Sequence, residues 1–286
     1  MKKHAGSLIT LAVVMSLALC SAMTTAEGQG AQAPAPTAKP YTPPRTPDGQ
    51  PNISGMWAGT PGGSYNIQDL EWQSLYQNNR PNPAMRGKSR LIDPPNAKIP
   101  YQPWAAEKRE FIASRHANPT LETLDPSSRC WPHGVPRHLY NRELEIFQSP
   151  GYVIIFNMAH HSYRVIPVDG RPHIPANVKL FMGDSRGRWE GHTLVVDVAN
   201  QNDQTWFDIV GDFHSDALHV SERFTIVDAD TIAYEATLTD PKVYTKPWKL
   251  GLSIERNKDY GDELWEEACV ESSQRSLEGM LNRPGR

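Results

Sequence analysis

The sequence predicts a mainly β protein, an antiparallel meander of short strands that closes into a β-barrel. Between residues 144 and 269, short runs rich in Val, Ile, Phe and Tyr are separated by turns such as Pro150-Gly151. Apolar and polar residues alternate with strand period in Leu218–Ile226 and Thr231–Thr239. Helical patterns are few, and a meander without crossover helices is most economically closed on itself.

The first 26 residues have the pattern of a signal peptide. Lys2 and Lys3 precede the apolar run Leu8–Leu19, which is too short to span a bilayer. Small residues favour cleavage after Ala22 or Ala26. We therefore expect a periplasmic or secreted protein.

The remainder of the chain is predicted to form one domain. The expected divisions are a signal peptide (1–26), a Pro/Ala-rich linker (27–51), a single β-barrel domain with an N-terminal loop and helix extension (52–274), and a tail (275–286). Pro103–His116 has the best helical pattern, with proline in its first turn and good helix formers behind it. A second short helix is possible at Asp69–Gln77, and Asp262–Cys269 is expected to be the last strand.

Charge restricts the partners. Cleavage after Ala26 removes two lysines and no acidic residue, leaving 27 basic against 32 acidic residues and a net charge of −5. This balance argues against nucleic acid or an anionic membrane surface as partner. No later run is long enough for a membrane helix. A small-molecule ligand is the expected partner, and nothing in the sequence indicates an oligomeric state.

Two cysteines remain after signal cleavage. Cys20 directly follows the apolar run and opens the alternative of lipidation, although Leu19 does not suit a lipobox. In an oxidising compartment, Cys130 and Cys269 are expected to form one disulfide. Closing a loop of ~140 residues would stabilise the fold by about 4–5 kcal/mol. The alternative is two buried free thiols.

Two resemblances extend this interpretation. Gly55-Met56-Trp57, which opens the first predicted strand, resembles the G-x-W signature of lipocalin-like barrels. The segments MGDSRGRWEGHTLVVD, HSDALHVSERFT and DPKVYTKPW resemble a large group of exported bacterial proteins that are mostly called hypothetical proteins. That resemblance extends over Pro51–Glu271 and includes PYQPWAA, RCWPHGVPR and NMAHHSYR. It implies fold and export and does not imply a reaction.

Four residues are the leading candidates for a catalytic site: His161, His214 and Glu222 as acid–base groups, and Arg164 as a group that stabilises developing negative charge. His161 and His214 could exchange protons near neutral pH, and Arg164 follows His161 at the start of a predicted strand. Glu222 stands on an otherwise apolar strand face, where a carboxylate must be paired or have a raised pKa. The alternative for Glu222 is a salt bridge to Arg164 or Arg256, and for His161 a hydrogen bond that closes a turn.

The run Gly183–Gly191 is predicted to be a tight charged loop. Its charges are expected to pair and pin a connection between strands, which is the favoured interpretation. In the alternative interpretation, Asp184 is a catalytic base and Arg186 holds an anionic group of the substrate.

Four further residues are candidate ligand contacts. Asp197 interrupts an apolar run, and His219 lies near His214. Tyr244 and Trp248 could stack on a ring of the ligand, or fill the core. Asp197 could equally be an ordinary turn residue.

No organic cofactor is predicted. The chain lacks a P-loop, a dinucleotide-binding G-x-G-x-x-G and a G-x-S-x-G nucleophile elbow. A bound divalent metal remains an alternative, because nine histidines remain after cleavage and could supply ligands. No recognised zinc spacing is present.

Three classes of function follow. The leading expectation is an exported, cofactor-independent enzyme of the lyase, isomerase or hydratase type. It would act by His/carboxylate chemistry on a small apolar or aromatic molecule. The second is a non-catalytic carrier of an apolar ligand. The third is an envelope protein whose polar clusters are structural.

Overall fold

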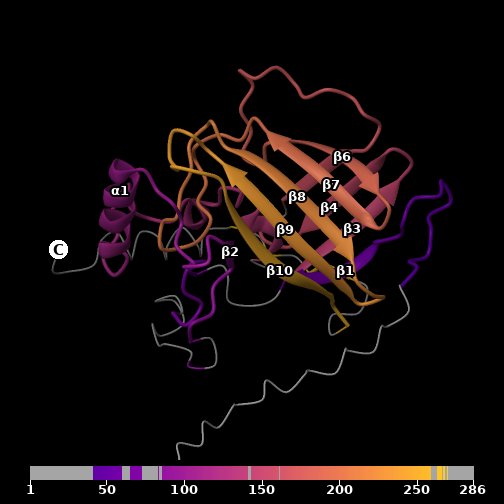
Figure 1. Ribbon diagram of the computed structural model, residues 1–286, viewed down its shortest axis with the longest axis horizontal. Helices are drawn as coiled ribbons and strands as arrows, with labels where there is room; N and C mark the ends of the chain where they lie inside the picture. The colour runs from indigo at the N-terminus through magenta and orange to yellow at the C-terminus, as the bar shows by residue number, and fades with distance from the viewer. Residues whose placement is uncertain are drawn as a thin grey trace, which may run out of the picture. The chain divides into compact units, whose positions relative to one another are not determined.

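The computed structural model describes residues 41–59, 65–72, 83, 86–140, 143–160, 162–258, 263–265, 267 and 269. Strands make up most of the regular structure (Figure 1). They are β1 (Gly55–Gly59), β2 (Leu91–Asp93), β3 (Glu143–Ser149), β4 (Tyr152–Asn157), β5 (Tyr163–Pro167), β6 (Asp184–Glu190), β7 (Thr193–Ala199), β8 (His219–Ile226), β9 (Thr231–Thr239) and β10 (Trp248–Arg256). The helical elements of the described residues are α1 (Pro103–Ser114) and the 3-10 turns η3 (Pro126–Arg129) and η4 (Arg137–Leu139).

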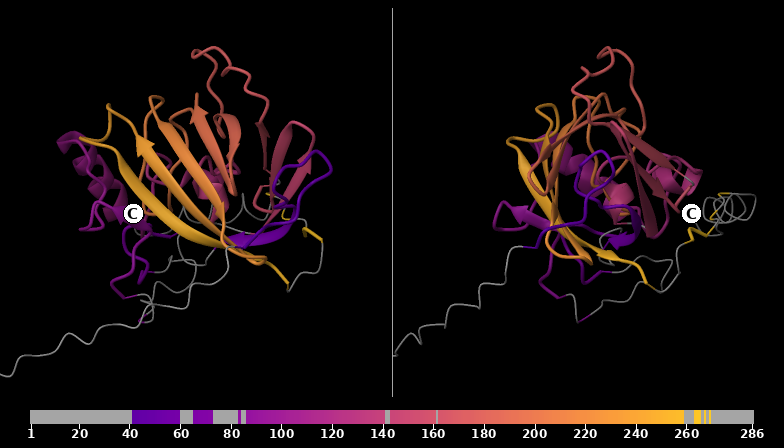
Figure 2. Two further views of the ribbon diagram at one scale, coloured as in Figure 1. Left: turned by 45° about the vertical axis from the view of Figure 1, so that its right-hand side comes forward. Right: turned by 90° about the vertical axis from the view of Figure 1, so that its right-hand side faces the viewer.

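All ten strands belong to one sheet of antiparallel pairs. Nine follow the order β5-β4-β3-β1-β10-β9-β8-β7-β6, and β2 pairs with β10. The sheet curves until its two end strands, β5 and β6, lie beside each other (Figure 2). The prediction of a mainly β, antiparallel barrel is confirmed, and the barrel is nearly closed.

The junction between β5 and β6, which we call the seam, has no backbone ladder in the described residues. Side chains bring the two strands together instead. Gly187 in β6 permits the approach, because a Cβ atom there would lie 2.8 Å from Cγ2 of Ile166 and 2.9 Å from Cγ1 of Val168. Residues 168–183 connect β5 to β6 and are called the strap below.

We call the two ends of the barrel the polar end and the Trp57 end. At the polar end, β7 finishes at Ala199 and β8 begins at His219. At the Trp57 end, β1 begins at Gly55 and β10 finishes at Arg256. β5 and β6 both begin at the polar end, so the strap returns from the Trp57 end to the polar end.

The predicted faces of β8 and β9 are confirmed. The buried residues of β8 are Val220, Glu222, Phe224 and Ile226, and those of β9 are Ile232, Tyr234, Ala236 and Leu238. The register places these residues opposite one another across the two strands. The strand period in the sequence therefore determined which side chains enter the barrel.

The prediction of a loop over Gly183–Gly191 is wrong, because Asp184–Glu190 forms β6. The four charged residues of this run occupy every second position and share one face of the strand. Ser185, Gly187 and Trp189 alternate with them on the other face. The strand period was present in the sequence, but three glycines in nine residues favoured a loop.

Two minor predictions also differ. Asp69–Trp72 forms turns and one bridge rather than a helix, and the rest of the predicted helix lies outside the described residues. The described positions between Asp262 and Cys269 form no strand and carry only an isolated bridge at Glu267.

The helix and the disulfide agree with expectation. α1 begins at Pro103 and ends at Ser114, and it buries Ala105 and Ile112. Cys130 and Cys269 are joined, with Cα atoms 5.5 Å apart and a sequence separation of 139 positions. The disulfide therefore attaches the distal part of the chain to the segment that follows η3.

The close approach at the seam gives a first prediction. Gly187→Ala should lower the free energy of unfolding by about 1–3 kcal/mol, because the added methyl group overpacks the contact with β5. Gly251→Ala is the matched control, since a Cβ there would meet Ile92 at 3.3–3.4 Å. Urea unfolding followed by tryptophan fluorescence measures both. Equal losses in the two variants would contradict close packing at the seam.

Candidate functional site

Buried polar side chains gather at the polar end. Those of the barrel wall and its loops are Asn157, Arg164, Ser185, Gln201, Thr205, His214 and Glu222, and His133, Arg137 and His138 join them from the segment before β3. Burial of polar groups is costly unless each has partners. Such a concentration of buried polar groups indicates a hydrogen-bond network that fixes one arrangement of the core, a functional site, or both.

The centre of this cluster is an ion pair inside the barrel. Arg164 of β5 and Glu222 of β8 are 3% and 0% exposed. Nη1 of Arg164 donates to Oε1 of Glu222 at 3.0 Å, and Nη2 donates to Oε2. The two parallel hydrogen bonds make this a bidentate pair, the strongest form of carboxylate recognition by arginine. Of the alternatives for Glu222, the salt bridge to Arg164 is the observed one.

Two further side chains complete the ion pair. Tyr234 of β9 donates from Oη to Oε1 of Glu222 at 2.7 Å. Nε of Arg164 donates to Oγ of Ser185 in β6 at 2.8 Å. Burial, and next the charge of Glu222, hold the pKa of Tyr234 well above its usual range, so the phenol stays protonated. The pair thus links β5, β6, β8 and β9 from within.

His138 in η4 lies close to this pair and has unused hydrogen-bonding capacity. Its side chain is buried, and neither Nδ1 nor Nε2 has a hydrogen-bond partner among the described residues. Nδ2 of Asn157, the last residue of β4, donates to the His138 carbonyl at 2.5 Å and fixes the backbone there.

The electrostatics of His138 keep it neutral. Burial, and next the positive charge of Arg164, lower its pKa well below the usual 6.5. The backbone of Gly134 raises this pKa by a smaller amount. Its geometry toward the ring does not meet the criteria of a hydrogen bond. A buried neutral imidazole beside a charged pair can accept or donate a proton.

His214 also lies at the polar end, but its ring is fully engaged. Nδ1 donates to the carbonyl of Ser215 at 2.9 Å, which leaves Nε2 as an acceptor. Nε2 lies 2.8 Å from Oγ1 of Thr205 and 3.2 Å from Nε2 of Gln201. Burial lowers the pKa of His214. It makes no hydrogen bond to Glu222.

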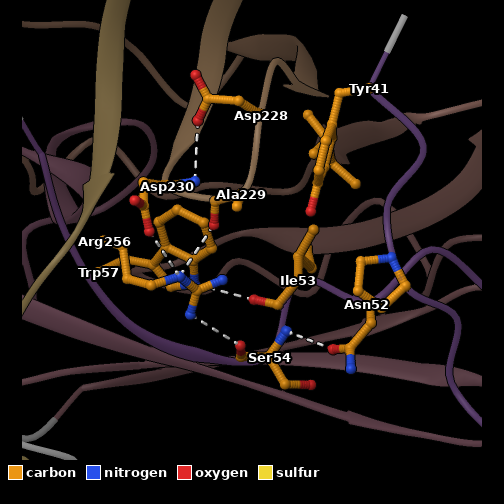
Figure 3. A pocket seen from close by; sticks show the side chains of 11 residues that line it. Tyr41, Asn52, Ile53, Ser54, Trp57, Asp228, Ala229, Asp230 and Arg256 are labelled. Carbon is orange, nitrogen blue, oxygen red and sulfur yellow. Dashed lines mark hydrogen bonds and ion pairs between the residues drawn. The ribbon is translucent and has the colours of Figure 1, made fainter.

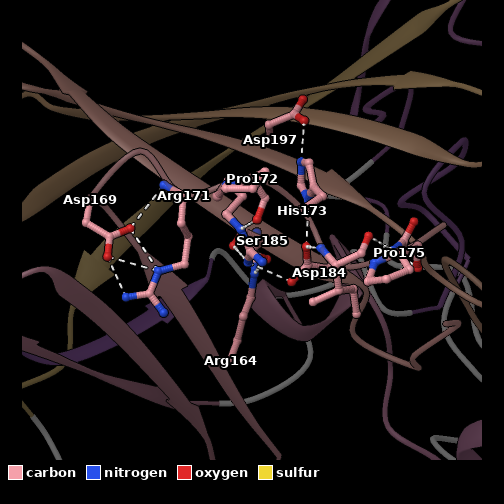
Figure 4. A network of polar contacts seen from close by, with 12 residues as sticks. Arg164, Asp169, Arg171, Pro172, His173, Pro175, Asp184, Ser185 and Asp197 are labelled. Carbon is pink, nitrogen blue, oxygen red and sulfur yellow. Dashed lines mark hydrogen bonds and ion pairs between the residues drawn. The ribbon is translucent and has the colours of Figure 1, made fainter.

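Four predicted site residues meet on the outer face of the barrel around His173, which was not predicted from the sequence. Figure 4 shows His173 between Asp184 and Asp197. Nδ1 of His173 in the strap lies 2.7 Å from Oδ2 of Asp184, and Nε2 lies 2.7 Å from Oδ2 of Asp197. Nε2 of His219 lies 2.7 Å from Oδ1 of Asp197. Arg186 donates to Oδ1 of Asp184 at 2.6 Å and to the Pro172 carbonyl at 2.8 Å.

This network holds the strap against the sheet. The partners of His173 come from β6 and β7, and the amide of Ile174 also donates to Asp184 at 3.1 Å. The pairing agrees with the favoured interpretation that these charges pin a connection. His173 stands between two prolines in RPHIP, and nothing local in that pattern indicates its distant partners.

Tyr244 and Trp248 lie in the core. Oη of Tyr244 donates to the Phe213 carbonyl at 2.7 Å, and its ring meets Trp248 edge-on with centroids 5.6 Å apart. Trp248 also packs edge-on against Phe207. These contacts correspond to the alternative of core filling.

Asp208 and Asp212 form a buried acidic pair that was not predicted from the sequence. Asp208 accepts hydrogen bonds from the amides of Ile67 and Asp212, both at 3.0 Å. Asp212 accepts from Nε of Arg109 in α1 at 3.0 Å and from Oη of Tyr101 at 3.1 Å. Burial, and next the charge of Asp212, raise the pKa of Asp208 well above its usual range. Two carboxyl groups four apart in WFDIVGD were the available signal.

The structure thus divides the predicted site residues. Arg164 and Glu222 meet inside the barrel, whereas His214 lies apart with its own partners. Asp184, Arg186, Asp197 and His219 meet outside, while Tyr244 and Trp248 fill the core. His161 lies outside the described residues.

Within the described residues, no three His, Cys, Asp or Glu side chains converge so that they could hold a metal ion. That part of the chain also contains no helix long and apolar enough to cross a membrane.

Comparison of the chain with models of protein families, with curated proteins and with solved structures finds no match in any of the three.

The ion pair gives a second prediction. Glu222→Gln should destabilise the fold by about 3–5 kcal/mol, because it leaves the guanidinium of Arg164 buried and uncompensated. Urea unfolding of Glu222→Gln, Arg164→Met and the double variant forms a double-mutant cycle. The double variant should lose less than the sum of the single losses. Additive losses would show that the two side chains act independently.

The outer network gives a third prediction. His173→Asn should release the strap, since asparagine cannot bridge Asp184 and Asp197. Amide exchange over 173–183 should accelerate roughly tenfold or more, because hydrogen bonds to charged groups contribute about 1.5–3 kcal/mol. Hydrogen–deuterium exchange with mass spectrometry measures this, and His192→Asn in the β6–β7 turn is the control. Unchanged protection of the strap in His173→Asn would show that other contacts hold it.

Proposed function

We propose that this chain is an exported enzyme that transfers protons within a small apolar or aromatic molecule. The reaction would be of the lyase, isomerase or hydratase type and would need no organic cofactor. The observation that carries the proposal is His138, a buried neutral imidazole with two unpartnered ring nitrogens beside a buried ion pair. Unsatisfied buried polar groups and strongly shifted pKa values are both typical of functional sites.

His138 would be the acid–base group. Its accepting nitrogen would take a proton from a carbon or hydroxyl of the substrate, and the resulting imidazolium would return a proton to a neighbouring atom. No proton is consumed overall, which fits isomerisation and, with water as reactant or product, hydration or elimination. In this role His138 replaces His214, whose ring nitrogens are both engaged.

Arg164 would stabilise negative charge that develops on the substrate, through the Nη hydrogens that Glu222 does not accept. Its guanidinium is fixed in place before reaction, which is the condition for effective electrostatic stabilisation. The charge of Arg164 is already balanced by Glu222. The site therefore suits an uncharged substrate better than a carboxylate.

Export rests on the N-terminal sequence pattern and agrees with the Cys130–Cys269 disulfide. Disulfides persist in the periplasm and outside the cell and are rare in the cytosol.

A non-catalytic carrier of an apolar ligand is the second candidate. It is favoured by the complete engagement of Glu222, whose two oxygens are already occupied by Arg164 and Tyr234. A carrier needs an apolar interior and no free acid–base group.

Proton transfer can be tested without knowing the substrate. The oxidised protein would be incubated in D2O with a panel of small aromatic ketones and aldehydes, and NMR would follow deuterium incorporation beside the carbonyl group. Wild type should accelerate exchange for at least one compound, and His138→Gln should reduce that acceleration by roughly 10²–10⁴-fold. His192→Asn, remote from the polar end, should retain it. Binding without exchange would favour the carrier.

The pH profile provides an independent readout. The pKa of His138 is lowered, so its neutral form should persist as the pH falls below 6.5, where an ordinary histidine becomes charged. Exchange should therefore be lost only at more acidic pH. An inflection at the position of a solvent-exposed histidine would contradict the assignment to His138.

A further inference from the structure

The Trp57 end of the barrel contains a pocket of about 290 Å³ (Figure 3). Its apolar lining includes Tyr41, Ile53 and Ile226, and its polar lining includes Asp228, Asp230 and Arg256. The volume lies just below the range of about 300–1,000 Å³ for small-molecule sites, so it suits a molecule of one or two rings. This pocket is at the opposite end of the barrel from the site proposed above.

The planar guanidinium of Arg256 is held in a fixed orientation at this pocket. Its guanidinium carbon lies 4.1 Å from the ring centroid of Trp57, which is 1% exposed. Nε donates to the Ala229 carbonyl at 3.1 Å, and Nη1 donates to the Ser54 carbonyl at 3.3 Å. These contacts fix the plane of the guanidinium before any ligand arrives.

The position of the Arg256 guanidinium requires glycine at residue 55. A Cβ atom at this position would lie 2.6 Å from Nη1 of Arg256, and its φ of +124° disfavours other residues. In Gly55-Met56-Trp57, the glycine therefore leaves room for Arg256 and the tryptophan supports it.

The charged side chains that line the pocket are Asp228, Asp230 and Arg256. The carboxylate of Asp228, which has no ion pair in the described residues, disfavours an anion. Asp230 is already engaged, with Oδ2 2.7 Å from Nζ of Lys258. Asp228 accepts from the amide of Asp230 through Oδ1 at 2.8 Å. Its Oδ2 has no hydrogen-bond partner among the described residues.

We propose that this pocket binds a planar aromatic molecule that carries a hydrogen-bond donor, such as a phenol, an arylamine or an indole. The ring stacks against the guanidinium of Arg256 between apolar walls, and the donor reaches Asp228. Cation–π contact with a supported arginine and a charge-assisted hydrogen bond together select this class over aliphatic alcohols and over aromatic hydrocarbons.

Isothermal titration calorimetry on the full-length, disulfide-bonded protein tests the proposal. Phenol, aniline and indole are the probes, and toluene, cyclohexanol and benzoate are the comparison compounds. The three probes should bind roughly three- to tenfold more tightly than toluene and cyclohexanol, which corresponds to the contribution of one cation–π contact. Benzoate should bind most weakly, because its charge meets Asp228.

Three variants localise the binding. Ala229→Trp fills the pocket from an exposed position and should abolish binding of phenol. Asp228→Asn should remove the preference for phenol over toluene. Lys249→Met is the control and should not affect binding, because Lys249 lies at the other end of β10 and donates to Glu235 of β9 at 2.8 Å. Thermal unfolding of each variant verifies that it is folded, and Asp228→Asn decides alone if Ala229→Trp does not fold.

Any of four results would overturn the proposal. The first is equal binding of phenol, toluene and cyclohexanol, and the second is tightest binding of benzoate or absence of binding by all three probes at millimolar concentration. The third is retained phenol binding by folded Ala229→Trp, and the fourth is an unchanged preference for phenol over toluene in folded Asp228→Asn. None of them bears on proton transfer at His138, which lies at the polar end.

Discussion

The buried pair of Arg164 and Glu222 is the interaction on which the closed form of the barrel depends. The seam between β5 and β6 has no backbone ladder in the described residues, so side chains must hold it. Arg164 does so from β5, through Ser185 of β6 and Glu222 of β8. Taking two charges out of water is costly, and the cost is offset only where geometry is good and the remaining hydrogen bonds are made. The bidentate contact and the hydroxyl of Tyr234 meet that condition.

The same pair makes the interior of the barrel asymmetric. Around it, loops and the segment before β3 bury polar groups that depend on one another, whereas Phe224 and Ile226 continue β8 as an apolar wall. Beyond that wall, Arg256 on Trp57 forms a second charged centre at the opposite end. The apolar part of the barrel interior therefore separates two chemically different environments, one at each end. The proposed proton transfer and the proposed aromatic pocket each use one of them.

Much of the fold could be predicted from local pattern. Alternation identified the inward residues of β8 and β9, because a strand places successive side chains on opposite faces whatever surrounds it. α1 was predicted from helix formers behind Pro103. β6 was missed although its charges alternate, because three glycines suggested a turn. Position 187 requires glycine because Ile166 approaches it closely across the seam. The two residues belong to different strands, so the sequence around Gly187 does not indicate this contact.

The sequence by itself determined the strand periods and the position of helix α1, and it predicted the disulfide between Cys130 and Cys269. It also supplied Arg164 as an alternative partner of Glu222. Only the tertiary structure decided the site, because its contacts join residues far apart in the chain. Closure of the sheet placed Arg164 against Glu222, 58 positions away, and brought His173 between carboxylates of two other strands. His138 acquired its shifted pKa from burial and from Arg164, neither of which is a property of the residues beside it.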